Sequence, residues 1–346
     1  MNATIIENKL EAEMELETNE EQSPKIEISW IIVAILGFNH VAAIYGLYLV
    51  FTSAKIATTL FAIFLYQFTM LGTTAGVHRL WAHRTYKAKW PLQVLLMIMF
   101  STSYQFSVLT WSRDHRVHHK FTDTNADPYS SKRGFLFSHM GWVFLKKHPD
   151  VAKKGKEIDV SDLYNNPLVR FQHEHKTAVL MLCCYVLPTL IPMYFWNETL
   201  ANSFYVAVAL RWTFTAHLVG LVNSVAHMFG NKPYDKNLTA VENMSAAILT
   251  SGEGWHNYHH AFPWDYSASE LGNHWTNNTT RFIDFFARIG WAYDLKTVSP
   301  DLVRKRTLRT GDGSHPVWGW NDKDLTEEDR LGATILSPQS GTKIFK

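Results

Sequence analysis

Hydrophobic residues are gathered into long, nearly uninterrupted runs along this chain. A helix needs about 20 mostly apolar residues to cross the hydrocarbon core of a bilayer. Four runs are long enough: Trp30–Phe51, Ala54–Thr74, Thr177–Trp196 and Phe204–Val225. Short connections join them into two helical hairpins. The pattern therefore predicts an all-α membrane protein with four transmembrane helices. The mean hydropathy of the whole chain, −0.12, does not reveal these spans because the apolar residues are concentrated in a few segments.

The polar segments outside these runs carry three tight clusters of histidine, in HRLWAHR, HRVHHK and HNYHH. Imidazole is a good metal ligand that is largely neutral near pH 7. Two separate H-x-x-H-H clusters in one chain indicate a transition-metal site. The clustered residues are His78, His83, His115, His118, His119, His256, His259 and His260.

The spacing of these histidines indicates how they converge. In each H-x-x-H-H cluster the positions i, i+3 and i+4 lie on one helical face. His78 and His83 are five residues apart, roughly 140° around an ideal helix, so they require a helix end or a distorted turn. Asn223 and His227, one turn apart at the end of the fourth run, would face the same site.

Nine imidazoles are too many for one ion, and we expect two ions with four or five ligands each. Nitrogen-rich coordination suits iron, zinc or copper, whereas a structural zinc site is closed by four ligands. Metal-bound imidazoles usually donate their other N–H to a carboxylate or carbonyl. The acidic candidates near the clusters are Asp114, Asp123, Asp127, Glu253 and Asp265.

A fifth apolar run, Pro91–Leu109, lies between the first two histidine clusters. If it crossed the membrane, these clusters would lie on opposite sides and could not share a site. We therefore predict that it is interfacial or packs against the helical bundle.

Charge favours one orientation and suggests a division of the chain. Residues 78–176 hold sixteen Lys/Arg against eight Asp/Glu, so the positive-inside rule predicts a cytoplasmic loop and cytosolic termini. The acidic segment 1–28 is expected to be disordered. Residues 29–310 would form the membrane domain, with a cytosolic helical cap from 78–176 and 226–310. A polar tail, 311–346, would follow.

The motifs TAGVHRLWAHR, WSRDHRVHHKF, NSVAH and GEGWHNYHHAFPWDY resemble those of animal acyl-CoA desaturases, the insect members most closely. The similarity runs from about Ser29 to about Pro300. It implies an endoplasmic-reticulum enzyme that removes two hydrogens from a saturated acyl-CoA with dioxygen. A di-iron centre would be held by the nine histidines, with Asn223 binding through water. No catalytic residue beyond these ligands is implied.

The resemblance also implies partners and substrate contacts. Electrons would come from NADH through cytochrome b5, a separate protein because no His-Pro-Gly-Gly haem motif is present. The expected partners are acyl-CoA, this electron donor and the lipid bilayer, with no nucleic acid. Arg113 and Asp114 match residues near the CoA head group, and Lys146 and Lys147 match a basic pair that contacts its phosphates. Phe106 replaces a family asparagine that contacts CoA.

Two questions stay open at the level of sequence. Histidine spacing does not separate a desaturase from a related di-iron hydroxylase or acetylenase. A non-catalytic membrane metal-binding or transport protein is a more distant alternative, because few ionisable residues occur in the spans. For the floor of the acyl tunnel we select Ala62 and Tyr66, one turn apart on the second span.

Overall fold

The computed structural model describes residues 27–271, 275–318 and 326–331. Most of the segment expected to be disordered, 1–28, lies outside the described residues, as does most of the tail from 319 onward. Within the described part of the tail, His315 is fully buried, and its Nε2 lies 2.9 Å from a carboxylate oxygen of Glu270.

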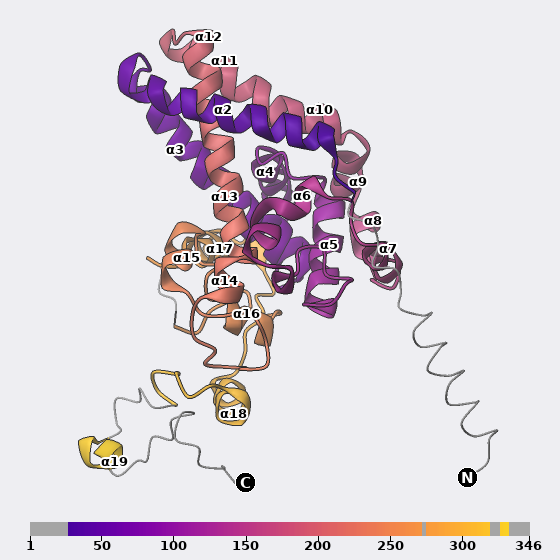
Figure 1. Ribbon diagram of the computed structural model, residues 1–346, viewed down its shortest axis with the longest axis vertical. Coiled ribbons are helices and arrows are strands. Elements are labelled where there is room, and N and C mark those ends of the chain that lie inside the picture. The colour runs from indigo at the N-terminus through magenta and orange to yellow at the C-terminus, as the bar shows by residue number, and fades with distance from the viewer. Residues whose placement is uncertain (1–26, 272–274, 319–325, 332–346) are drawn as a thin grey trace, which may run out of the picture.

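The four predicted spans are confirmed as the long apolar helices of the described chain. They gather at one end of the molecule, and the cap lies at the other (Figure 1). The first span is α2 (Trp30–Thr52). The others are built from shorter elements: α3 (Ile56–Leu71) with η1 (Gly72–Ala82); α10 (Lys176–Met181) with η4 (Leu182–Val186) and α11 (Leu187–Trp196); and α12 (Leu200–Asn202) with η5 (Ser203–Leu210), α13 (Arg211–Asn223) and α14 (Val225–Met228).

The fifth apolar run does not span, as predicted. It forms α4 (Trp90–Ser101), whose 12 residues extend only about 18 Å, too little for a bilayer core. The helix packs lengthwise against η1, where a Cβ on Gly72 would lie 2.3 Å from the Phe100 backbone nitrogen. Only glycine permits this close approach. It fixes the position of η1, which carries the first histidine cluster.

The cap is built from short helices around two hydrophobic clusters, of which the larger lies between α4, η1 and α17. Leu92, Leu96 and Phe100 of α4 pack there with Val77 of η1 and Ile283 of α17, all fully buried. The cap helices are α5 (Val108–Phe121), η2 (Ser131–Arg133), η3 (Phe137–Gly141), α6 (Trp142–Phe144), α7 (Pro149–Gly155), α8 (Ser161–Asn165), α9 (Pro167–Glu174), α15 (Met244–Leu249), α16 (His256–Ala261), α17 (Asn278–Arg288), α18 (Pro300–Thr310) and α19 (Glu327–Leu331).

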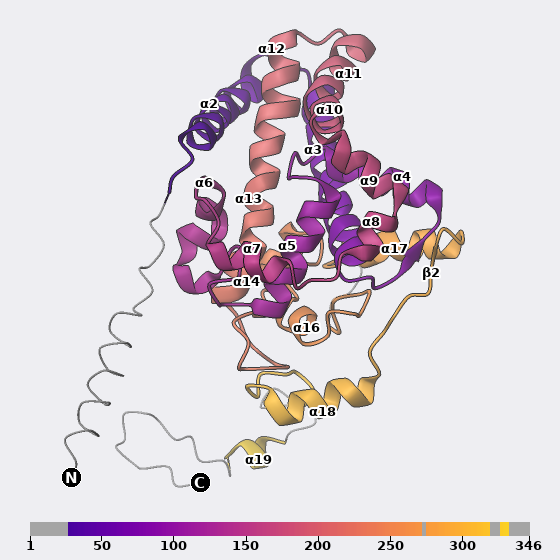
Figure 2. The same ribbon diagram turned by 90° about the vertical axis from the view of Figure 1, so that its right-hand side faces the viewer.

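Two short strands link the beginning and the end of the cap. β1 (Lys87–Ala88) pairs antiparallel with β2 (Ala292–Tyr293), with Lys87 opposite Tyr293. Beyond β2, α18 lies on the far side of α16 from the spans (Figure 2). The helices that carry the histidine clusters are therefore enclosed between the membrane bundle and the C-terminal part of the cap.

Candidate metal centre

The first histidine cluster lies on the π-helix η1 rather than on a regular α-helix. The amide of His83 donates to the carbonyl of His78 at 3.0 Å, the i→i+5 bond of a π-turn. This wider turn brings residues five apart to the same side, and the two rings lie 4.9 Å apart. The distorted turn that the spacing requires is present, and the second span continues through it to Ala82.

The nine histidines of the sequence motifs converge as two groups, and within each group the potential ligand atoms all lie within 4.8 Å of one another. We call these the five-histidine group and the four-histidine group. The first contains His78, His83, His115, His119 and His259, and the second contains His118, His227, His256 and His260.

The nitrogen geometry fits a transition metal in each group. In the five-histidine group, Nε2 of His259 lies 3.0 Å from Nε2 of both His78 and His119. In the four-histidine group, Nε2 of His256 lies 3.0 Å from that of His227. Neighbouring ligands at about 2.1 Å from one octahedral ion would be about 3.0 Å apart. Nε2 of His118 is buried and has no hydrogen-bond partner in the part of the chain that the structure describes, as expected of an atom that binds an ion.

Carboxylates fix one imidazole in each group. Nδ1 of His78 lies 2.7 Å from Glu253, and Nδ1 of His118 lies 2.9 Å from Asp127. When Nδ1–H donates to the carboxylate, the other ring nitrogen, Nε2, is the one that can bind a metal ion. Of the five acidic candidates from the sequence, these two make such contacts.

Hydroxyl groups orient two further imidazoles, and the sequence did not identify the residues that carry these hydroxyls. The Tyr129 hydroxyl lies 3.1 Å from Nδ1 of His115, and the Thr239 hydroxyl lies 2.9 Å from Nδ1 of His227. Tyr129 follows Asp127 by two residues, so its closeness to an acidic candidate could have identified it from the sequence. Thr239 is twelve residues from His227 in a loop, and nothing in the sequence marks it.

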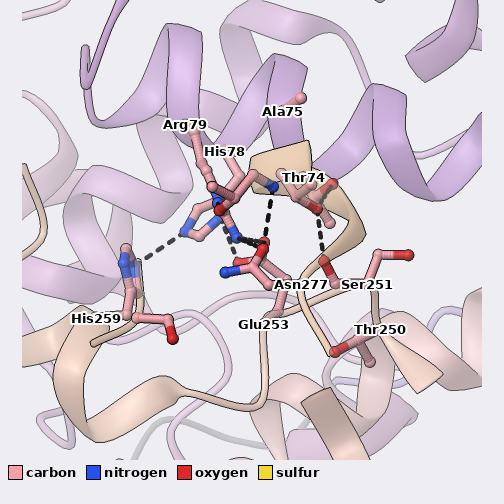
Figure 3. A network of polar contacts seen from close by, with 12 residues as sticks. Thr74, Ala75, His78, Arg79, Thr250, Ser251, Glu253, His259 and Asn277 are labelled. Atoms are coloured by element: carbon pink, nitrogen blue, oxygen red, sulfur yellow. Dashed lines mark hydrogen bonds and ion pairs between the residues drawn. The ribbon is translucent and has the colours of Figure 1, made fainter. Parts of the chain in front are cut away.

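Arg79 connects this site to the rest of the cap (Figure 3). The side chain is fully buried, and its Nη2 donates to the second oxygen of Glu253 at 2.8 Å. Its Nη1 donates to the carbonyls of Tyr266 and Ser267 and to Thr280. The negative charge of Glu253 is thus balanced by Arg79, while the same carboxylate orients His78.

The site is electrostatically suited to a cation. Burial, followed by the effect of neighbouring histidines, lowers the pKa of several rings far below the usual value; these are His83, His115, His119, His256, His259 and His260. Burial alone would raise the pKa of Glu253, but Arg79 and His78 hold it at about 2. These six imidazoles are therefore neutral near pH 7, and the Glu253 carboxylate is charged.

An apolar cavity of about 430 Å³ reaches both groups from the membrane bundle. His78 and His115 of one group and His256 of the other line it, together with Asn223. Asn223 is the last residue of α13, just before the helix breaks at Ser224. Asn223 thus lines the same cavity as these three histidines.

The residues expected near an anionic head group lie in two places. Asp114 lines the cavity and forms ion pairs with Arg113, at 2.7 Å, and with Lys147. Phe106 also lines the cavity, and the Lys147 ammonium lies 5.7 Å from its ring centre. Lys146 pairs instead with Glu27, at the start of the described chain.

The two residues selected as the tunnel floor do not line the cavity. Ala62 packs with Leu49 and Val206 in a separate cluster. The Tyr66 hydroxyl donates to the Leu249 carbonyl at 2.6 Å. Met70, one turn beyond Tyr66 and almost fully buried, lines the cavity from the same helix.

Comparison with known proteins agrees with this site. The family model described as Fatty acid desaturase matches residues 53–277. An acyl-CoA Delta-9 desaturase of Acheta domesticus is 56% identical over 309 residues, 89% of this chain and 86% of that protein. An acyl-CoA Delta12-desaturase of the same species is also 56% identical, covering 89% and 86%. Acyl-CoA desaturase 3 of Mus musculus is 50% identical over 84% of this chain and 81% of its own. The chain belongs to the fatty acid desaturase family and is an acyl-CoA desaturase.

Proposed function

We propose that each histidine group holds one iron ion and that dioxygen is the co-substrate in the dehydrogenation of a saturated acyl-CoA. Two iron ions with dioxygen supply the oxidising power to remove hydrogen from an unactivated methylene, which acid–base side chains lack. The observation that carries the proposal is the convergence of nine imidazoles beside an apolar cavity. Asn223, at the cavity wall, would contribute through a bound water.

The cavity would hold the acyl chain and position one pair of its carbons. Its walls are mostly apolar, and each methylene moved into it from water gains about 0.8 kcal/mol. His78, His115 and His256 at the wall would bring the reacting carbons beside both groups. Glu253 and Asp127 would hold the protons at Nδ1 of their histidines throughout, so that these rings keep their orientation.

The charged residues at and near the cavity would bind the CoA part of the substrate. Arg113, Asp114 and Lys147 form a connected ion-pair cluster. Their remaining hydrogen-bonding capacity suits phosphate and amide groups. Lys146 would contribute a further positive charge nearby. Phe106, beside Lys147, would offer a flat apolar contact instead of an amide.

The cellular setting follows from the family resemblance and the charge pattern. Cytochrome b5 would deliver electrons as a separate protein, in the endoplasmic-reticulum membrane. Both termini would be cytosolic, with the membrane domain formed by residues 29–310. The product would carry a double bond, usually cis.

Expression in a desaturase-deficient yeast, followed by fatty-acid profiling with double-bond location, tests the proposal. We expect unsaturated products and about two iron ions per purified chain. His118→Ala should abolish turnover and lower the iron content, because it removes one nitrogen of the four-histidine group. Hydroxylated or acetylenic products would favour the related oxidases instead, and full activity in iron-free protein would contradict the proposal.

A further inference from the structure

A second recess lies on the outer face of the membrane bundle, directly behind the cavity. Six residues line it: Ala34, Ile35, Phe38, Asn39, Tyr185 and Phe204. Three of them, Ile35, Asn39 and Tyr185, also line the main cavity. A single layer of side chains therefore separates the cavity from the surface that faces lipid.

Two polar side chains, Asn39 of α2 and Tyr185 of η4, lie in this layer. Asn39 is buried, and its side-chain amide donates to the Ile35 carbonyl of its own helix at 2.9 Å. Polar groups in apolar surroundings are costly unless they are paired. The Ile35 carbonyl satisfies the Asn39 amide within α2 itself, so this bond does not tie α2 to a neighbouring helix.

The two halves of α2 are held in different ways. In its second half, Ala42, Ala43, Gly46 and Leu49 are buried, and a Cβ on Gly46 would lie 2.1 Å from the Tyr205 carbonyl oxygen. In the first half only Leu36 and Asn39 are buried. Figure 2 shows this half of α2 leaning away from α13.

Individual polar contacts, together with a small apolar cluster of Leu36, Cys184 and Trp212, hold the first half. The Ser29 amide donates to the Phe144 carbonyl at 2.8 Å. Nε2 of His40 lies 3.0 Å from that of His217 on α13, and His217 in turn lies 3.0 Å from His139 on η3. His139 itself lines the cavity. The first half of α2 is thus held at its start by the Ser29–Phe144 hydrogen bond and at its end by the His40–His217 contact.

We propose that this wall is a lateral gate through which the acyl chain passes between the cavity and the bilayer. The inference rests on the proposed function, which assigns the cavity to the acyl chain. A chain that entered lengthwise from the cytosolic side would be drawn through water, and the cost grows with every methylene. Sideways passage keeps the chain in apolar surroundings while the CoA part stays outside the membrane.

A reversible cross-link tests the gate. Phe38→Cys with Phe204→Cys places one thiol on each side of the recess, and neither residue lines the main cavity. The control joins Tyr45→Cys, on the tightly packed half of α2, to Tyr205→Cys on η5; the two wild-type rings lie 4.8 Å apart. Both pairs are joined by a short thiol-cleavable reagent in liposome-reconstituted protein, with Cys183 and Cys184 replaced by serine in both.

The measurement is the association rate of fluorescent palmitoyl-CoA, which requires no turnover. We expect the recess cross-link to slow association by roughly tenfold or more, as when gate opening limits a step, and a reductant to restore it. The control cross-link should leave the rate unchanged. Equal rates with and without the recess cross-link would overturn the gate. If the uncross-linked protein does not bind palmitoyl-CoA at all, the cavity assignment itself fails, and the gate with it.

A second variant needs no cross-linker. Ala34→Trp fills the recess from α2, whereas Val41→Trp places the same side chain on an exposed position of α2 that lines neither cavity. We expect slower association only for Ala34→Trp. Identical rates in the two variants would contradict the gate.

Discussion

Replacing Glu253 by glutamine is expected to loosen the metal centre, whereas the same replacement at Glu242 is not. The two glutamates differ in their partners. Glu253 accepts from His78 at 2.7 Å and from Arg79 at 2.8 Å, and its pKa is about 2, so it is charged. Glu242 makes no ion pair among the described residues, and desolvation raises its pKa to about 8. Glu242 is therefore mostly protonated at pH 7, and glutamine imitates it.

The magnitude follows from what each substitution leaves behind. Glu253→Gln removes the only carboxylate that pairs with the fully buried Arg79 among the described residues, and breaking a buried pair in this way costs about 3–5 kcal/mol. It also places an amide N–H against either the His78 ring or the guanidinium. Loss of such a contact to a metal ligand typically costs about 10- to 100-fold in metal affinity. Glu242→Gln keeps an oxygen that can accept from the Tyr258 amide, so its cost should stay within about 1 kcal/mol.

Two measurements on purified protein at pH 7 check this contrast. Iron content after dialysis against a graded chelator series gives relative metal affinity, and thermal unfolding gives stability. We expect Glu253→Gln to lose iron at a lower chelator concentration and to unfold on the order of 10 °C earlier. Glu242→Gln should follow the wild type in both. Equal behaviour of the two variants would refute the assignment of a charged Glu253 and a neutral Glu242.

Three other predictions concern pH, substrate length and packing. Metal-stripped protein should lose stability as the pH falls below about 6.5. Its buried histidines have a lowered pKa, so the unfolded chain binds more protons than the folded chain does. The free energy of unfolding should fall by at most about 1.4 kcal/mol per pH unit for each histidine. Unfolding temperatures from pH 8 to 5.5 check it, and flat values would contradict it. Met70→Ala should shift product profiles toward longer acyl chains, whereas substitutions at Ala62 should not, because only Met70 lines the cavity. Gly72→Ala should sharply lower the yield of folded protein, judged by size-exclusion chromatography, since its Cβ would meet the α4 backbone; a normal yield would show that α4 can move.

Sequence reasoning succeeded where the physical constraint is local. Bilayer thickness sets the length of a span, so four spans could be predicted from hydropathy alone. The demand that His78 and His115 share a site excluded a crossing at α4, and their rings lie 4.6 Å apart. The five-residue spacing of the first cluster required a distorted turn, and the chain forms a π-helix there.

Sequence reasoning failed where the answer depends on the rotation and depth of packed helices. Ala62 and Tyr66 lie on the correct span, but a cavity forms only where neighbouring helices leave space. That space reaches Met70 and not the turn before it. Thr239 was missed for the same reason, since it meets His227 only through tertiary packing.

The division of nine histidines into five and four follows from helix geometry. Positions i and i+4 differ by about 40° around a helix, whereas i+3 lies about 60° to the other side. On α5, His115 and His119 accordingly join the five-histidine group, and His118 joins the other. On α16, His256 and His260 join the four-histidine group, and His259 joins the other.

The helix α5 therefore contributes two nitrogens to the five-histidine group and one to the four-histidine group, and α16 does the reverse. The π-helix η1 adds two to the five-histidine group, and α14 adds one to the four-histidine group. Because α5 and α16 each carry histidines of both groups, the binding of one ion would depend on the binding of the other. A displacement of either helix would move ligands of both, so loss of a single histidine such as His118 should weaken the retention of both ions.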